Sequence, residues 1–499
     1  MTGRTVNRWA VLAVLCASLL LVAMDATILN VALPSLIDDL DPDAYEQLWI
    51  IDIYGLVLGG LLITAGAAGD RWGRKTFFLV GFVLFGAASI VSATADSPGR
   101  LIAGRVLLAV GGAMVMPSTL SLIRNVFTDP RERGTAIGVW ASVAGAGAAI
   151  GPVLGGLLVE HYGWSAAFWV NVPVVVATVV FGWRLLPESR SPGRTRLDWF
   201  GAAQSVFGMI SLVWGIKHLA KDGLASSAPV ALLAGAGLLA WFAWRQLRQT
   251  DPLLDVRLFT NRPFLAGAIA TLMAMMAVGA AYFLISLWLQ YVHGYSPVEA
   301  GVRMLPGALA TLVGALSAPW LVRRVGVHTM LALGLGALVV AFVALATLPL
   351  TYGVAALALV AFGLGDGLAI TTTTAVMISA APPERAGSAA AVEETCYELG
   401  IGFGVALLGT IAAVLYASGV HELPLSEPGR TAVEESIGGA VHVARTQGAQ
   451  VSGYLLEVAR SAYEHALAVT SAISAALIAA ATLLALALIP RGFRADAEH

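Results

Sequence analysis

The sequence predicts an all-α protein that crosses a lipid bilayer many times. Of its 499 residues, 58% are hydrophobic and 12% are charged, and the mean hydropathy is +0.81. A soluble protein of this length has about 25% charged residues. The apolar residues gather in runs of roughly 20, the length that crosses the hydrocarbon core as a helix. These observations exclude a large soluble core.

Fourteen apolar runs are long enough to span a membrane. The first run follows Arg4 and Arg8, as a signal peptide would. It is too long for one and lacks a cleavage-like end, so we expect it to stay in the protein. The predicted runs are residues 9–36, 47–68, 76–95, 101–123, 134–159, 164–186, 198–217, 228–247, 263–290, 298–322, 328–349, 353–380, 387–417 and 467–490.

Charge distribution predicts the orientation of the chain. Most of the 29 Lys and Arg residues fall in loops on the side that carries both termini. Because basic loops stay in the cytoplasm, both termini are predicted to be cytoplasmic.

Several function classes are excluded by composition. The net charge of −2 gives no reason to expect a nucleic-acid partner. Cys16 and Cys396 lie in apolar runs, so no disulfide framework is implied. The sequence has neither a phosphate-binding loop nor an HExxH motif, which argues against an ATP-driven pump and a membrane enzyme. We expect no cofactor and no metal site.

Residues 418–466 form the longest connection between runs. A solvated loop is one interpretation, and an ordered hairpin or re-entrant helix is the other. The second half favours a helix because apolar residues recur there at helical spacing. They are Val451, Leu455, Val458, Ala462 and Ala466.

A worn internal repeat indicates two related bundles. GAAGDRWGRKTFFL (66–79) and APWLVRRVGVHTML (318–331) both place basic residues and glycine in a turn before an apolar run. Two bundles with a central insertion explain this pattern. The predicted domains are an N-terminal six-helix bundle, two inserted helices and a C-terminal six-helix bundle, at 1–190, 191–255 and 256–499.

Motifs along nearly the whole chain resemble those of the major facilitator superfamily. GAAGDRWGRK is similar to its cytoplasmic loop signature, and AIGPVLGGLL is similar to its antiporter motif on the fifth span. MDATILNVALP, WSAAFWVNVP and LIAGRVLLAVGGA resemble motifs of its fourteen-helix drug:proton antiporters. WIIDIYGLVLGG and VEETCYELG resemble the bacterial branch that exports quaternary ammonium compounds, dyes and biguanides. Ala109 stands where a glycine is usual, and Thr311 stands where some members of that branch carry an acid.

The resemblance implies two six-helix bundles, two extra central helices and no enzymatic activity. It implies proton-coupled efflux of lipophilic, mostly cationic drugs across a bacterial cell membrane by alternating access. The partners are then small lipophilic cations, protons and the lipid bilayer, and we expect a monomer. A dedicated exporter of one antibiotic or metabolite in a producer organism is the alternative.

Two glycine-containing motifs are candidates for conformational change. Small residues let helices approach closely, and a mid-span proline kinks its helix. In the antiporter motif these residues are Gly147, Gly151, Pro152, Gly155 and Gly156. The loop signature resembles a latch, although its basic residues also suit a simple cytoplasmic anchor. The predicted latch residues are Gly66, Asp70, Arg71, Gly73 and Arg74.

Acids inside the predicted spans are the main candidates for transport. Asp25 lies deep in the first run, where a charge costs roughly 2.5–3.5 kcal/mol, and Arg105 is the nearest basic candidate. Both are predicted to take part in proton coupling. Asp52 and Tyr54 suit capture of an organic cation, although aromatic residues at that depth also form interfacial belts. Asp366 is either a substrate-binding acid or a structural hydrogen-bonding group.

Three glutamates stand out in VEETCYELG. Counting from Arg385 at the edge of the run, Glu394 lies about 13 Å deeper and Glu398 nearly 20 Å deeper, near the middle of the core. These two share a helix face, and Glu393 is rotated away. Buried carboxyl groups exchange protons and neutralise cations, so we assign Glu394 and Glu398 to proton coupling. Glu393, Glu394, Tyr397 and Glu398 are predicted to bind substrate. A wet cytoplasmic funnel is the alternative environment.

Overall fold

The computed structural model confirms an all-α architecture. It describes residues 7–490 except 190–197, 223–225, 250–251, 253, 255, 383–385, 422–426 and 447–448, together with residue 493. The side chains of some residues within helices, including Asp70, lie outside this description. Every regular element in the described part is helical.

The N-terminal half consists of seven helices from the first six predicted runs. They are α1 (Arg8–Leu40), α2 (Ala44–Trp72), α3 (Arg74–Ala93), α4 (Pro98–Val126), α5 (Pro130–Tyr162), α6 (Ala166–Trp169) and α7 (Asn171–Leu185). Two inserted helices follow, α8 (Trp199–Asp222) and α9 (Ala228–Arg248).

The C-terminal half begins with the short 3₁₀ helix η1 (Val256–Thr260). The remaining elements are α10 (Arg262–Leu287), the π-helix η2 (Trp288–Val292), α11 (Pro297–Thr347), α12 (Tyr352–Ala380), α13 (Ala386–Phe403), the π-helix η4 (Gly404–Gly409), α14 (Thr410–Val420), α15 (Glu427–Glu435), α16 (Ile437–Thr446) and α17 (Ala449–Leu488).

Each of the fourteen predicted runs is helical, and some of them are divided over two or three consecutive helical elements. Most ends differ by a few residues, but α17 begins well before its run. Within the described residues, eleven helices are long and apolar enough to cross a membrane. One of them, the 51-residue α11, contains two predicted runs that are separated at Gly326, where φ is +80°. A positive φ favours glycine, so the sequence itself places the break.

The described part of the long connection is mostly helical. Two short helices, α15 and α16, fill its first part, and α17 starts well before the predicted run. Leu455 is 1% exposed, and Ala462 and Ala466 are also buried, as their spacing predicts. Val451 is exposed. The ordered interpretation of this region was therefore correct.

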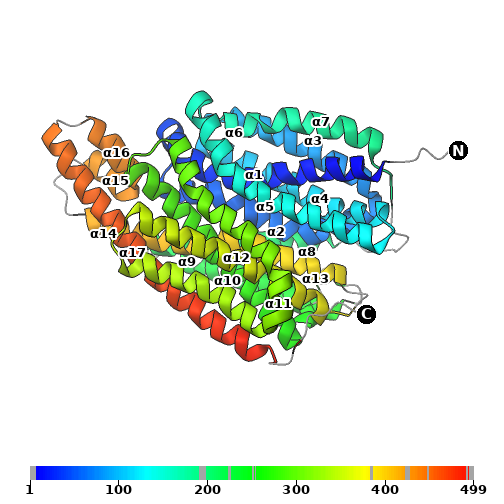
Figure 1. Ribbon diagram of the computed structural model, residues 1–499. Coiled ribbons are helices and arrows are strands. Elements are labelled where there is room, and N and C mark those ends of the chain that lie inside the picture. The colour runs from blue at the N-terminus through cyan, green and yellow to red at the C-terminus, as the bar shows by residue number, and fades with distance from the viewer. Residues whose placement is uncertain are drawn as a thin grey trace.

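The two halves lie side by side, each with its own apolar core. In Figure 1 the N-terminal half is blue to cyan and the C-terminal half is green to red. Both termini lie at one end of the molecule, and α15 and α16 lie at the opposite end. One buried cluster is built from α1 to α7, and a second from α10 to α17 with a few residues of α1 and α2. The domain boundaries given above remain a prediction.

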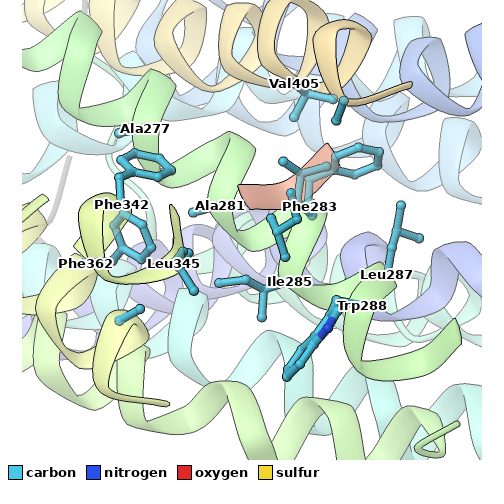
Figure 2. Packing of buried hydrophobic residues seen from close by; sticks show 14 of the residues in the cluster. Ala277, Ala281, Phe283, Ile285, Leu287, Trp288, Phe342, Leu345, Phe362 and Val405 are labelled. Carbon is cyan, nitrogen blue, oxygen red and sulfur yellow. The ribbon is translucent and has the colours of Figure 1, made fainter. Parts of the chain in front are cut away.

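Aromatic packing fills the core of the C-terminal half (Figure 2). Phe342 of α11 meets Phe362 of α12 edge to face, with ring centroids 4.7 Å apart. Trp288 is fully buried, and its indole N–H donates to Glu464 of α17. This contact ties the π-helix η2 to the last helix.

Contacts between the halves gather toward the end that carries α15 and α16. The Ser286 hydroxyl donates to the Asn30 carbonyl at 2.6 Å, and the Tyr291 hydroxyl donates to the Pro34 carbonyl at 3.3 Å. Arg445 of α16 forms an ion pair with Asp38 of α1 at 3.3 Å. These contacts join the halves at the end opposite the termini.

Candidate transport site

Asp25 and Arg105 form a buried ion pair in the N-terminal half. Arg105 Nη1 donates to Asp25 Oδ2 at 2.8 Å, and Arg105 Nε donates to the Ile50 carbonyl at 3.1 Å. Asn171 Nδ2 donates to the other Asp25 oxygen at 3.0 Å. The Arg105 guanidinium also lies 4.5 Å from the ring centroid of Tyr54. The sequence identified both charged partners but not Asn171, although it lies in the quoted WSAAFWVNVP motif.

Asp52 forms a second buried pair with a partner that the sequence analysis missed. Lys217 Nζ of α8 lies 3.0 Å from Asp52 Oδ2, and both side chains are 0% exposed. The same ammonium lies 3.9 Å from the ring centroid of Trp49. A lysine inside an apolar run was the available signal, because charged residues at membrane depth are usually paired. Asp52 therefore faces a cation of the protein itself, and its predicted role in substrate binding stays a prediction.

The three glutamates lie on α13, which packs against α2 of the N-terminal half. Glu398 is 7% exposed, and its backbone packs closely against Gly55 of α2. Thr395 donates to the Gly59 carbonyl at 3.4 Å. In the described part of the chain, no base lies within ion-pair distance of Glu393, Glu394 or Glu398. This arrangement leaves three carboxyl groups close together without an ion-pair partner among the described residues, although the charge of Arg105 acts on Glu398.

The side chain of Glu393 forms a hydrogen bond with the neighbouring helix α12. Glu393 accepts from the Thr374 hydroxyl of α12 at 2.6 Å. Glu394 is half-buried one residue further on. Thr374 is another residue that the sequence analysis missed.

Two aromatic residues surround these acids. Tyr54 lies beside Arg105, and the charges of both Asp25 and Glu398 act on its hydroxyl group. Tyr54 is therefore near both the ion pair of the N-terminal half and the α13 acids. Tyr397 lies within Coulombic range of the three α13 glutamates and of Asp366. The structure thus brings most predicted substrate-binding residues to one region.

Asp366 lies on α12, near enough to Tyr397 and Tyr282 for its charge to act on both hydroxyl groups. Its Oδ1 atom is buried and has no hydrogen-bond partner among the described residues. The expectation of a structural hydrogen bond is therefore not met by this oxygen.

The antiporter motif brings α5 against helices of both halves. The Cα atoms of Gly147, Gly151 and Gly155 face α1 so closely that a Cβ there would overlap it. Gly156 faces α11 instead, against Pro297 and Val298. Pro152 lies within α5, and its carbonyl approaches Gly301 of α11. The close approach that the small residues predict is present on two sides of the helix.

The predicted latch is held by an acid from outside the motif. At Gly73 φ is +111°, and a Cβ would overlap the carboxylate of Glu188. Glu188 accepts from the backbone N–H groups of Lys75 and Thr76, both at 3.2 Å. It also accepts from the Thr76 hydroxyl at 2.6 Å. Glu188 therefore caps the first turn of α3, a role that the sequence analysis missed.

Burial acts to raise the pKa of Glu188, but hydrogen bonds from Thr76, Ser189 and Lys75 outweigh it and lower the pKa below its usual value.

Of the other predicted latch residues, Arg71 and Arg74 lie at the same turn and Gly66 lies further back in α2. Arg71 is exposed, and the Arg74 backbone N–H donates to the Ser189 carbonyl at 3.0 Å. Gly66 packs against Pro117 of α4. The side chain of Asp70 lies outside the described residues, so its predicted partner stays a prediction.

Comparison with known proteins decides the family. Residues 15–405 match the family model of the Major Facilitator Superfamily. The chain belongs to this superfamily. It is therefore a transporter and not an enzyme.

Among the superfamily's characterised members, several efflux proteins are similar over almost their full length. The chain is 41% identical to the multidrug efflux pump LfrA of Mycolicibacterium smegmatis over 484 residues, 96% of each chain. It is 36% identical to the methyl viologen resistance protein SmvA of Salmonella typhimurium, over 95% of this chain and 97% of that protein. It is 35% identical to the tetracenomycin C resistance and export protein of Streptomyces glaucescens, over 95% and 91%.

Solved structures agree at the level of the fold. A bacterial homologue of the human lysosomal transporter Spinster, in an inward-facing and unoccupied conformation, aligns with a TM-score of 0.67 and 17% identity. The alignment covers 97% of this chain and 98% of that one. The major facilitator fold predicted from the sequence is confirmed, and the relatives establish a drug-efflux and resistance class.

Proposed function

We propose that this protein is a proton-coupled antiporter that exports lipophilic, mostly cationic drugs from a bacterial cell. The observation that carries the proposal is the group of three carboxyl groups, Glu393, Glu394 and Glu398, on the helix that packs against α2 of the N-terminal half. No base among the described residues forms an ion pair with them. An ionised carboxylate attracts a lipophilic cation, and a proton on it removes that attraction. Proton and drug therefore compete for one site.

Competition becomes antiport when it is coupled to two alternating states. A ligand shifts such an equilibrium only by its differential affinity for the two states. The halves join toward the end that carries α15 and α16, and the close contact of α5 with α11 gives a surface on which they can rock. Asp25 and Arg105 lie next to this surface and are proposed to couple proton binding to the change of state.

The residues around the proposed cation site have separate roles. Glu394 and Glu398 hold the cation, while Tyr397, Tyr54 and Asp366 form aromatic and acidic walls around it. The latch residues at Gly73 stabilise one of the two states. The chain acts as a monomer in the cell membrane with both termini in the cytoplasm, as its distribution of basic residues supports.

Export of a single antibiotic is the second candidate. The 35% identity to the tetracenomycin C resistance and export protein favours it. The buried acids favour cations instead, because a neutral antibiotic gains nothing from a group of carboxylates.

Transport in membrane vesicles tests the proposal. Inside-out vesicles with an acidified lumen should accumulate ethidium, and a protonophore should stop the uptake. If uptake requires ATP and ignores the pH gradient, the proposed mechanism is wrong. If ethidium and other cations are ignored while one neutral antibiotic is carried, the second candidate replaces the first.

A further inference from the structure

The hydroxyl group of Thr374 lies between two hydrogen-bond acceptors. Its Oγ1 atom is 2.6 Å from Glu393 Oε1 and 2.9 Å from the Ile370 carbonyl of its own helix. A threonine hydroxyl has one hydrogen to donate and two lone pairs to accept. At any moment it can therefore donate to only one of these two oxygens.

The Ile370 carbonyl already has other donors. Thr373 donates its hydroxyl to this oxygen at 3.0 Å, and α-helical geometry adds the backbone N–H of Thr374. Thr271 of α10 donates in turn to Thr373 at 2.8 Å. Because a carbonyl oxygen has two lone pairs, the hydrogen of Thr374 is freest to point at Glu393.

The same geometry allows a hydrogen bond when Glu393 is protonated. A protonated carboxyl group has one O–H to donate, and Thr374 Oγ1 can accept it. The Thr374 hydrogen then turns to the Ile370 carbonyl at 2.9 Å, where it shares the oxygen with Thr373. The contact between α12 and α13 is kept in both states, and only one hydrogen changes direction.

Other titratable groups near Glu393 cannot replace this bond. The charged and titratable groups that the structure describes near Glu393 lie on α13 itself or on a helix that packs against it. None of them forms a hydrogen bond with Glu393. They include Glu394, Cys396, Tyr397 and Glu398 of α13, Asp366 of α12, Tyr282 and Arg262 of α10, and Glu46, Asp52, Tyr54 and Arg71 of α2.

We propose that Thr374 is a positioning residue that lets Glu393 take up and release a proton without breaking the contact between α12 and α13. The inference rests on the proposed antiport and adds a division of labour within it. Glu393 faces the threonine hydroxyl and exchanges the proton. Because Glu393 lies beside Glu394, which holds the cation together with Glu398, proton and cation still compete for one group of acids. The proton comes from water on one side of the membrane and leaves to water on the other, and no other covalent bond changes.

The test compares two substitutions of Thr374 with a matched control. Thr374→Val keeps the shape and removes the hydroxyl group, whereas Thr374→Ser keeps the hydroxyl group. Thr371→Val is the control, because Thr371 donates to the Gly367 carbonyl at 2.9 Å and is half-buried like Thr374. Ethidium uptake by inside-out vesicles is measured for each variant over a series of pH values.

We expect the pH of half-maximal transport to rise by roughly one unit in Thr374→Val, because ionised Glu393 loses a charge-assisted hydrogen bond. Thr374→Ser should return it to within a few tenths of the wild-type value, and Thr371→Val should not move it. If Thr374→Val and Thr371→Val have the same profile as the wild type while uptake stays gradient-driven, the Thr374 inference is wrong and antiport stands. If wild-type uptake ignores the gradient, antiport itself is wrong.

Infrared titration of the purified transporter gives an independent readout. The carboxyl stretching band of Glu393 is assigned by its loss in Glu393→Gln. The band should shift in frequency in Thr374→Val and keep its position in Thr374→Ser. A band that is unchanged in Thr374→Val overturns the inference, even if that variant transports poorly.

Discussion

The two halves of the molecule hold their buried acids in different ways. In the N-terminal half, Asp25 is bound by Arg105 and Asn171, and Asp52 is bound by Lys217 of the insert. In the C-terminal half, Glu393, Glu394, Glu398 and Asp366 have no base within ion-pair distance among the described residues. One half fixes its negative charges, and the other leaves them available.

This difference separates acids that are held in place by a base from acids that can bind a proton or a cation. A buried acid with a basic partner is held in place, and removal of one partner leaves an uncompensated charge. An acid without a partner is costly in its ionised form, so it gains from binding a proton or a cation. Stability should therefore depend on the pairs of the N-terminal half, and substrate choice on the acids of α13.

The largest effect is expected at Asp25. Asp25→Asn mimics the protonated state permanently, so ethidium uptake driven by the gradient should fall to background while the protein still inserts. Arg105→Ala should slow turnover more than it weakens equilibrium binding of ethidium. Vesicle uptake and binding titrations measure both. Wild-type uptake by Asp25→Asn would remove this pair from the coupling mechanism.

Breaking the insert pair tests the stabilising side of the comparison. Lys217→Met leaves Asp52 unpaired and buried, which should cost about 3–5 kcal/mol in free energy of unfolding. The double variant with Asp52→Asn should recover most of this loss. Thermal unfolding in detergent is the measurement.

An exposed ion pair is the matched control for Lys217. Arg100 and Asp96 lie 3.4 Å apart with side chains that are 45% and 77% exposed. Arg100→Met should cost at most about 1 kcal/mol, because exposed pairs contribute little. Equal losses for Lys217→Met and Arg100→Met would contradict the view that the insert is held by a buried charge.

Substrate choice tests the second part of the comparison, the unpaired acids of α13. Glu394→Gln leaves one carboxylate of the Glu394 and Glu398 pair, which matches one positive centre but not two. An unpaired charge in a buried site costs several kcal/mol, so export of the dication methyl viologen should fall by more than about tenfold. Export of the monocation ethidium should be partly kept, and the melting temperature should not fall.

Asp96→Asn makes the equivalent change of charge at an exposed position and should leave both transport rates unaltered. Equal losses for the two substrates in Glu394→Gln would instead favour the wet-funnel interpretation of the α13 acids.

The smallest effect is expected at Glu188. Its pKa is lowered in the folded protein, so its contribution to stability is present above the unfolded-state pKa, near 4.3, and is lost as the pH falls through the folded-state value. Glu188→Gln should therefore melt slightly below the wild type at neutral pH, and the difference should shrink below about pH 4. Thr76→Ser keeps the donor hydroxyl and should melt like the wild type. A difference that grows in acid would contradict this sign.

Sequence reasoning predicted most of the fold because membrane helices are local features. A run of about twenty apolar residues defines a helix almost independently of its neighbours. The break in α11 and the start of α3 could also be predicted, because each falls at a glycine. Gly326 and Gly73 both have positive φ in the structure, which glycine allows.

The partners in the site were less readable because they are set by packing between distant segments. Asp25 and Arg105 could be matched as the acid and the base at similar depth. Lys217 could not be assigned to Asp52 without knowing that α8 lies against α2. Thr374 is one of four consecutive threonines, and the sequence does not tell which of them faces Glu393.

The pair of Asp52 and Lys217 also has a consequence for the order of synthesis. A ribosome makes Asp52 long before Lys217, and it makes Arg105 80 residues after Asp25. Both acids therefore enter the membrane ahead of the bases that neutralise them. Until α8 follows, Asp52 must remain protonated or stay in contact with water or with the insertion machinery. A chain that stops before residue 217 leaves Asp52 without its partner, so the insert completes the half of the molecule that was made first.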